Sequence, residues 1–300
     1  MKSSRVLPAY LLALLFLVSV IWPFVKEEPV PKPFLYDENG AVVDTTPYPP
    51  SSLYLLGTDR EGRDLYYLLV IGAKWTMIFA FIVTAFRIIL ATFLGVWLKN
   101  WLTSPWVEGF LQAFTFVPQS LIAIIWLAPF LLYELRSAPS LTQPQSIFLQ
   151  LFVLTIVGVP TTAKMVGETV RIIHAFDFMD SARVLGGSSY HRARRHVFPH
   201  LLPRLIILSG RQLVQVLTLL LHLAIFHIFI GGTVITSGQE HDQFNVYSSS
   251  TYEWAGLIGS RYGELLLEPY IVLFPVMAYS FLILLVNTVV NDLEKSNKNP

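Results

Sequence analysis

The chain has 300 residues and a formal net charge of +1; 54% of its residues are hydrophobic and only 14% are charged. Soluble proteins carry about 25% charged residues, so this composition excludes an ordinary soluble domain and predicts a membrane protein. The absence of cysteine excludes disulfides, thiol catalysis and cysteine-ligated metals. The net charge itself says nothing about nucleic acid, and we expect no nucleic-acid partner for a membrane protein of this kind.

Six apolar segments are long enough to cross a bilayer, which takes about 20 helical residues. They predict an all-α, polytopic membrane protein with six transmembrane helices at residues 9–25, 75–98, 106–133, 146–166, 203–231 and 269–290. The first segment also has the form of a signal peptide, but bulky residues follow it where a cleavage site needs small ones. We therefore expect the first segment to be retained as a span.

Lysine and arginine are unevenly distributed between these segments. The densest group lies between the fourth and fifth predicted spans and consists of Lys164, Arg171, Arg183, Arg192, Arg194, Arg195 and Arg204. Basic residues concentrate in cytoplasmic loops, so we place this segment, and with it both termini, in the cytoplasm. The segments 26–56 and 232–268 then lie outside, and the proline-rich first one should contain little regular structure.

The basic segment also predicts its own local structure. Asp177 can cap a short helix, and Asp180 then lies in the first turn, where negative charge is favoured. Gly186 and Gly187 end this helix, because glycine readily takes the left-handed cap conformation. Ser188 can start a second, basic helix that stops before the two prolines that follow. A helix of two turns is marginal alone in water, so it needs a surface to dock against.

The string at residues 180–188, followed by residues 195–199, resembles the cytoplasmic loop signature of permease subunits in ATP-binding cassette importers. The resemblance implies that a cytoplasmic coupling helix lies here and inserts into an ATPase subunit. The residues that it assigns to this contact are Asp180, Ser181, Ala182, Arg183, Leu185, Gly186 and Gly187. Asp180 replaces the usual glutamate, and Ser181 replaces an alanine. Without the resemblance, the segment is a basic juxtamembrane loop that binds anionic lipid.

A second string, at residues 56–65, precedes the second predicted span and indicates a turn followed by an amphipathic helix at the membrane surface. It resembles the Leu-Gly-Thr-Asp-x-x-Gly-Arg-Asp string of dipeptide, oligopeptide and nickel importer permeases, and implies the second of their two permease subunits. The matching residues of this extracytoplasmic signature are Gly57, Thr58, Asp59, Gly62, Arg63 and Asp64. We therefore divide the chain into 1–73, with the first helix, outer loop and interfacial segment, and 74–300, a five-helix permease core with its coupling loop at 167–203.

The fifth predicted span carries four polar side chains on one helical face: Arg211, Gln215, Thr218 and His222 recur at intervals of three and four residues. Ionisable groups within a span usually face a bundle interior or a wet cavity, so this face is a candidate wall of a translocation path. The alternative is that these side chains hydrogen-bond to neighbouring spans, with Arg211 extending to the membrane surface.

The outer loop 232–268 contains Tyr252-Glu253-Trp254-Ala255-Gly256, which resembles a segment before the last span of the same permeases. Residues 238–250 form a longer and more polar stretch than that family usually has. Without the resemblance, the segment around Trp254 is an interfacial helix with an aromatic anchor.

No phosphate-binding loop of the form G-x-x-x-x-G-K-[ST] occurs, and the histidine pairs lack the spacing or the glutamate of a helical zinc site. We therefore expect no catalytic residue, metal or cofactor in this chain, and the resemblance places ATP and magnesium on two cytoplasmic ATPase subunits. It also implies a homologous permease subunit, an extracytoplasmic binding protein and a multi-pass location in the bacterial plasma membrane.

The resemblance implies peptide uptake, with nickel or a metal chelate as the alternative cargo. The residues alone leave a different class of protein open, a secondary transporter or an intramembrane enzyme that uses Arg211 and His222 as a proton relay. Neither the broken-helix nor the repeat pattern of many secondary transporters is expected from the sequence.

Overall fold

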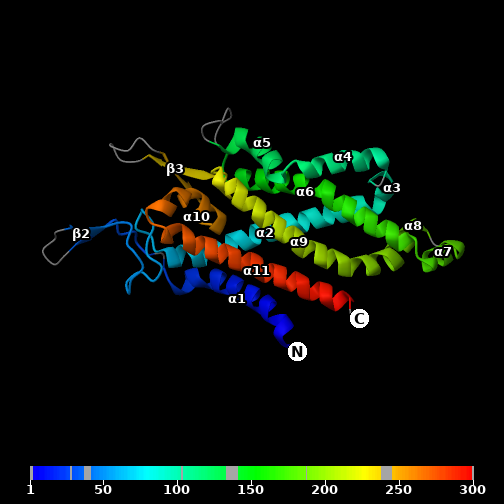
Figure 1. The fold of residues 1–300 in the computed structure, drawn as a ribbon, viewed down its shortest axis with the longest axis horizontal. Helices are drawn as coiled ribbons and strands as arrows, with labels where there is room; N and C mark the ends of the chain where they lie inside the picture. The colour runs from blue at the N-terminus through cyan, green and yellow to red at the C-terminus, as the bar shows by residue number, and fades with distance from the viewer. Residues whose placement is uncertain are drawn as a thin grey trace.

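The computed structural model describes residues 3–27, 29–36, 42–102, 104–132, 141–186, 188–237 and 245–298. These residues form an elongated bundle of helices, with short hairpins at one end and the basic segment at the other (Figure 1). Five helices within the described residues are long and apolar enough to cross a membrane. They are α1 (Ser3–Val25), α2 (Leu65–Trp97), α6 (Gln143–His174), α9 (Phe198–Ile225) and α11 (Tyr270–Lys298). The predicted all-α polytopic membrane fold is confirmed.

α2 begins ten residues earlier than the predicted second span, at Leu65. Asp64 caps the helix, because its carboxylate accepts a hydrogen bond from the backbone N–H of Tyr66 at 2.9 Å. The helix continues without a break to Trp97, so the segment that we expected to form a separate interfacial helix is the start of α2. The predicted division between residues 73 and 74 therefore lies inside one helix.

The third predicted span, 106–133, is divided into α4 (Pro105–Phe116) and α5 (Gln119–Leu131), and the short α3 (Lys99–Leu102) precedes them. The break follows from Pro118, whose ring disfavours helical torsions in the preceding residue. Val117 accordingly has φ −90° and ψ 120°. A broken helix is thus present where we expected none, and neither half has the length of the five long helices.

At the basic end, the short helix that we predicted is α7 (Asp177–Val184). Asp177 is its first helical residue rather than its cap. Gly186 has φ +79°, so the predicted left-handed end of this helix is confirmed. Ser188 caps the next helix, α8 (Ser189–Arg192), since its hydroxyl accepts from the N–H of His191 at 3.2 Å.

We predicted that the basic helix stops before Pro199 and Pro203, and this prediction is wrong. α8 passes into a π-helix, Ala193–Val197, which leads directly into α9. Pro199 lies in the first turn of α9, directly after the π-helix, and Pro203 lies within α9. The wider π turn before Pro199 lets the helix continue past it.

The opposite end of the bundle carries two antiparallel hairpins. β1 (Phe34–Tyr36) pairs with β2 (Val42–Thr45), and β3 (Thr233–Ser237) pairs with β4 (Asn245–Ser249). The helix α10 (Trp254–Arg261) and a 3-10 turn (Tyr262–Leu266) then lead into α11. α10 packs among α2, α9 and α11.

Trp254 is buried, with 4% of its surface exposed, and its indole N–H donates to the carbonyl of Leu69 at 2.7 Å. Trp254 therefore anchors α10 to α2. An interfacial anchor would face the membrane surface, and Trp254 does not. Gly72 makes this contact possible, because an added Cβ there would lie 2.0 Å from the carbonyl oxygen of Tyr252.

Candidate functional site

Three regions contain the residues that the sequence singled out, and the first is α7 with its flanking turns. Met179 is 3% exposed and packs in an apolar cluster with Val166, Val170 and Leu201 of α6 and α9. Phe178 stacks on the ring of His200, with ring centroids 5.0 Å apart. α7 is therefore attached to α6 and α9 through one face.

The other face of α7 and the turn after it are exposed. Val184 and Leu185 are each 86% exposed, and nothing lies within 4 Å of a Cβ added at Gly186. Of the predicted contact residues, Asp180 and Ser181 are also exposed and Ala182 is half-buried. Gly187 and the side chain of Arg183 lie outside the described residues. A short helix fixed by one face and presenting two apolar side chains at its tip has the form of a docking element.

The second region is the polar face of α9. Gln215, Thr218 and His222 line a groove of about 470 Å³ together with the break between α4 and α5 and with Thr161 of α6. The side chain of Gln119, at the start of α5, donates to the hydroxyl of Thr161 at 3.4 Å. Its buried carbonyl oxygen has no hydrogen-bond partner among the described residues. The groove is thus lined by several polar side chains, and one of them, Gln119, has an acceptor that is not used within the described residues.

Arg211 lies on the same helical face but in a neighbouring groove of about 430 Å³ that also includes Arg204, Glu168 and Glu294. Its Nε donates to the carboxylate of Glu294 on α11 at 2.9 Å. The structure thus brings three of the four predicted path residues together and places Arg211 in an ion pair beside them. Within the described residues no contact joins Arg211 to His222, so the alternative proton relay has no direct connection.

Arg87, which the sequence analysis gave no role, is buried next to the groove lined by Gln215, Thr218 and His222. Its guanidinium donates to the carbonyl of Leu154 from two nitrogens, at 2.8 and 2.5 Å, and to Gln212 at 3.3 Å. Gly158 leaves it room, because an added Cβ would lie 2.3 Å from the guanidinium carbon. Arg87 thus joins α2, α6 and α9. Its position as a lone charge in an apolar run was the signal that could have identified it.

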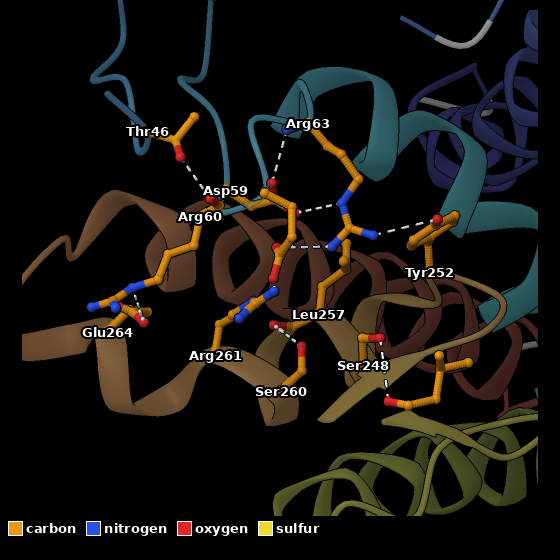
Figure 2. A network of polar contacts seen from close by, with 12 residues as sticks. Thr46, Asp59, Arg60, Arg63, Ser248, Tyr252, Leu257, Ser260, Arg261 and Glu264 are labelled. Atoms are coloured by element: carbon orange, nitrogen blue, oxygen red, sulfur yellow. Dashed lines mark hydrogen bonds and ion pairs between the residues drawn. The ribbon is translucent and has the colours of Figure 1, made fainter. Parts of the chain in front are cut away.

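The third region is the signature string before α2, residues 57–64; Figure 2 shows Asp59 and Arg63 of this string with their contacts. Gly57 and Gly62 adopt φ +79° and +75°, which favour glycine. They shape a tight turn in which Asp59 accepts from the N–H of Arg63 at 2.9 Å and from its Nε at 2.8 Å. Thr58 and Asp64 pair across the same turn.

Arg63 extends from this turn to contact Glu61 at 3.0 Å and the hydroxyl of Tyr252 at 3.4 Å (Figure 2). Arg261 of α10 also binds Glu61, and Arg60 binds Glu264 at 2.6 Å. The signature therefore connects the loop before α2 to α10 through buried and half-buried ion pairs. It is a structural joint between this loop and α10.

The charges of this joint perturb one another. Burial raises the pKa of Asp59 to about 6, assisted by the negative charge of Glu61 and opposed by Arg63. Burial alone would also raise the pKa of Glu61, but Arg261 and Arg63 outweigh it and lower that pKa. Nearby, burial raises the pKa of Glu253, although the N–H of Ile230 donates to it at 2.9 Å and two hydroxyls also hydrogen-bond to it.

The five long apolar helices define a polytopic membrane protein, and one of them carries a partly exposed polar face. Residues 87–298 match the family model described as "Binding-protein-dependent transport system inner membrane component". The chain belongs to this family, which confirms the predicted resemblance to importer permeases.

Similar proteins include one from Brucella suis assigned as a peptide transport system permease, which is 26% identical over 159 residues; the match covers 53% of this chain and 50% of that protein. An Escherichia coli K12 protein assigned as a D,D-dipeptide transport system permease is 22% identical over 199 residues, or 66% of this chain and 60% of that protein. The matches thus span only half to three fifths of the relatives' own length.

Proposed function

We propose that this chain is a permease subunit of an ATP-driven importer and that its cargo is peptides. The observation that carries the proposal is α7, a two-turn helix fixed by one face, ended by a left-handed glycine and exposing Val184 and Leu185 at its tip. Such a tip fits a cleft in a partner protein. The peptide cargo rests on the names of the relatives.

The proposed mechanism is mechanical. Met179 and Phe178 pack against α6 and α9, so an ATPase that shifts α7 also shifts the two helices that line the polar groove. Gln215, Thr218 and His222 then form one wall of the path, and a homologous permease supplies the opposite wall. No bond is made or broken by this chain; two cytoplasmic ATPases hydrolyse ATP with magnesium.

The proposed setting is the bacterial plasma membrane with both termini in the cytoplasm, because the densest basic segment surrounds α7. The hairpin end then faces outward, where an extracytoplasmic binding protein delivers the cargo.

The test is to purify the chain with its partner permease, ATPases and binding protein and to reconstitute the complex in vesicles. ATP hydrolysis and uptake should rise when the binding protein is loaded with short peptides. Stimulation by a nickel chelate but not by peptides would overturn the proposal that the cargo is peptides. Failure of ATPase subunits to bind would overturn the proposal that the importer is driven by ATP.

A further inference from the structure

A separate groove lies at the C-terminal end of α2, near the basic segment. It shares no lining residue with the two grooves along the polar face of α9. Its volume is about 370 Å³. One wall is the last two turns of α2, and the other is the segment 190–198, which contains the π-helix Ala193–Val197.

The walls of this groove are mainly apolar and accessible. Phe93 on α2 is 62% exposed, and Phe198 at the start of α9 is 48% exposed. Because both belong to the long apolar helices that cross the membrane, an aliphatic chain could lie between them without facing water.

The end of the groove nearest the end of α2 has a different chemistry. Trp97, the last residue of α2, and Tyr190 line it, and both rings are more than half exposed. Aromatic side chains with a polar tip are typical of the membrane–water boundary. Arg194 lines the same groove, is exposed, and makes no ion pair with any described residue.

Thr92 supplies an independent observation. Threonines within helices usually donate to the carbonyl four residues earlier, as Thr162, Thr218 and Thr288 do here. The hydroxyl of Thr92 is buried and has no hydrogen-bond partner among the described residues. Thr92 lies five residues before Trp97, which is about 7.5 Å along the helix axis. An unpaired hydroxyl among apolar walls would be stabilised by a polar group of a ligand.

We propose that this groove binds one anionic phospholipid. Its phosphate pairs with Arg194, an ester carbonyl accepts from Thr92, and an acyl chain lies between Phe93 and Phe198. A phospholipid fits because it combines, at these separations, an anion, hydrogen-bond acceptors and an aliphatic chain, and basic pockets at the ends of spans suit anionic headgroups. The wall 190–198 begins within α8, which follows α7, so a bound lipid would hold in place the segment that carries α7, whichever cargo is transported.

The test is native mass spectrometry of the purified, full-length permease complex, titrated with phosphatidylglycerol or with phosphatidylcholine that has the same acyl chains. We expect phosphatidylglycerol to bind about fivefold more tightly, the contribution of one basic side chain near a lipid headgroup. Equal binding of the two lipids would overturn the proposal.

Two neighbouring arginines give a matched pair of variants. R194Q should remove most of the preference for phosphatidylglycerol, whereas R195Q should change it less than about twofold, since Arg195 is equally exposed but does not line the groove. A193F should abolish binding of both lipids by filling the groove while Arg194 stays in place. Equal effects of R194Q and R195Q, or unchanged lipid binding in A193F, would overturn the site.

A final arm distinguishes lipid from protein. A benzophenone amino acid in place of Tyr190, irradiated in native membranes, should give a phospholipid adduct on this chain. An adduct with another protein subunit instead would show that the groove is a protein interface and would overturn the lipid proposal.

Discussion

The two ends of the bundle are held together in different ways. At the hairpin end, arginines and carboxylates from distant segments contact one another, and Gly72 lets two backbones meet. At the basic end, Arg194 and Arg195 are exposed, and the tip of α7 presents apolar side chains. The ion pairs of the first end join segments that are far apart in the sequence, whereas Val184 and Leu185 at the second end stay exposed.

The largest expected effect is at the hairpin end. R63M would leave Asp59, whose side chain is 4% exposed, without the cation that binds it. Removing one partner of a buried pair costs about 3 kcal/mol or more, so the melting temperature of the purified protein should fall by several degrees at pH 7.5. The matched variant R60M removes a half-exposed arginine and should cost under about 1 kcal/mol. Equal losses in both would mean that this end is not held by its buried charges.

A smaller effect concerns pH at the same end. The pKa of Asp59 in the folded protein, about 6, lies above the usual aspartate value of 3.8. As pH rises from about 4, the unfolded chain loses this proton first, so Asp59 removes stability up to about pH 6 and adds no further change above it. D59N should lack this fall, which is on the order of 3 kcal/mol. Parallel melting curves of D59N and the natural protein between pH 4 and 6 would contradict the assignment.

The smallest effect on stability is expected between the two ends. Gln215 is half-buried in the groove, and its side chain makes no hydrogen bond with any other described residue. Q215L should therefore leave the melting temperature unchanged and lower uptake about two- to tenfold, which corresponds to one lost hydrogen bond with the cargo. T288V on α11, outside the groove, serves as the control. Normal uptake by Q215L would mean that the polar face of α9 contributes only to packing and does not contact the cargo.

The difference between the ends also explains which features the sequence predicted. Gly186 after a two-turn helix is a local signal, so its left-handed conformation could be predicted. The start of α2 was missed although Asp64 before an apolar run is an N-cap signal, and the break at Pro118 was missed because apolar residues continue on both sides.

Contacts between segments that are far apart in the sequence leave no local sequence pattern from which they could be predicted. Arg261 and Glu61 are 200 residues apart, and nothing local indicates that they meet. The same holds for Gly72 against the backbone of Tyr252 and for the guanidinium of Arg87 against Gly158. The three polar residues of α9 could be assigned to one face by periodicity, but the second wall, built from the helix break, could not.

The central claim is that α7 couples this chain to an ATPase, and Gly186 tests it most directly. G186V forces a β-branched residue into a left-handed conformation, at about 1–2 kcal/mol, in a place where no neighbour contacts it. G186N is the control, because asparagine tolerates that conformation. The measurement is co-purification of the ATPase subunits with each variant, together with peptide uptake. The account predicts that both variants insert and pair normally, that G186V loses the ATPases or uncouples hydrolysis from uptake, and that G186N keeps both; full ATPase recovery and normal uptake in G186V would contradict it.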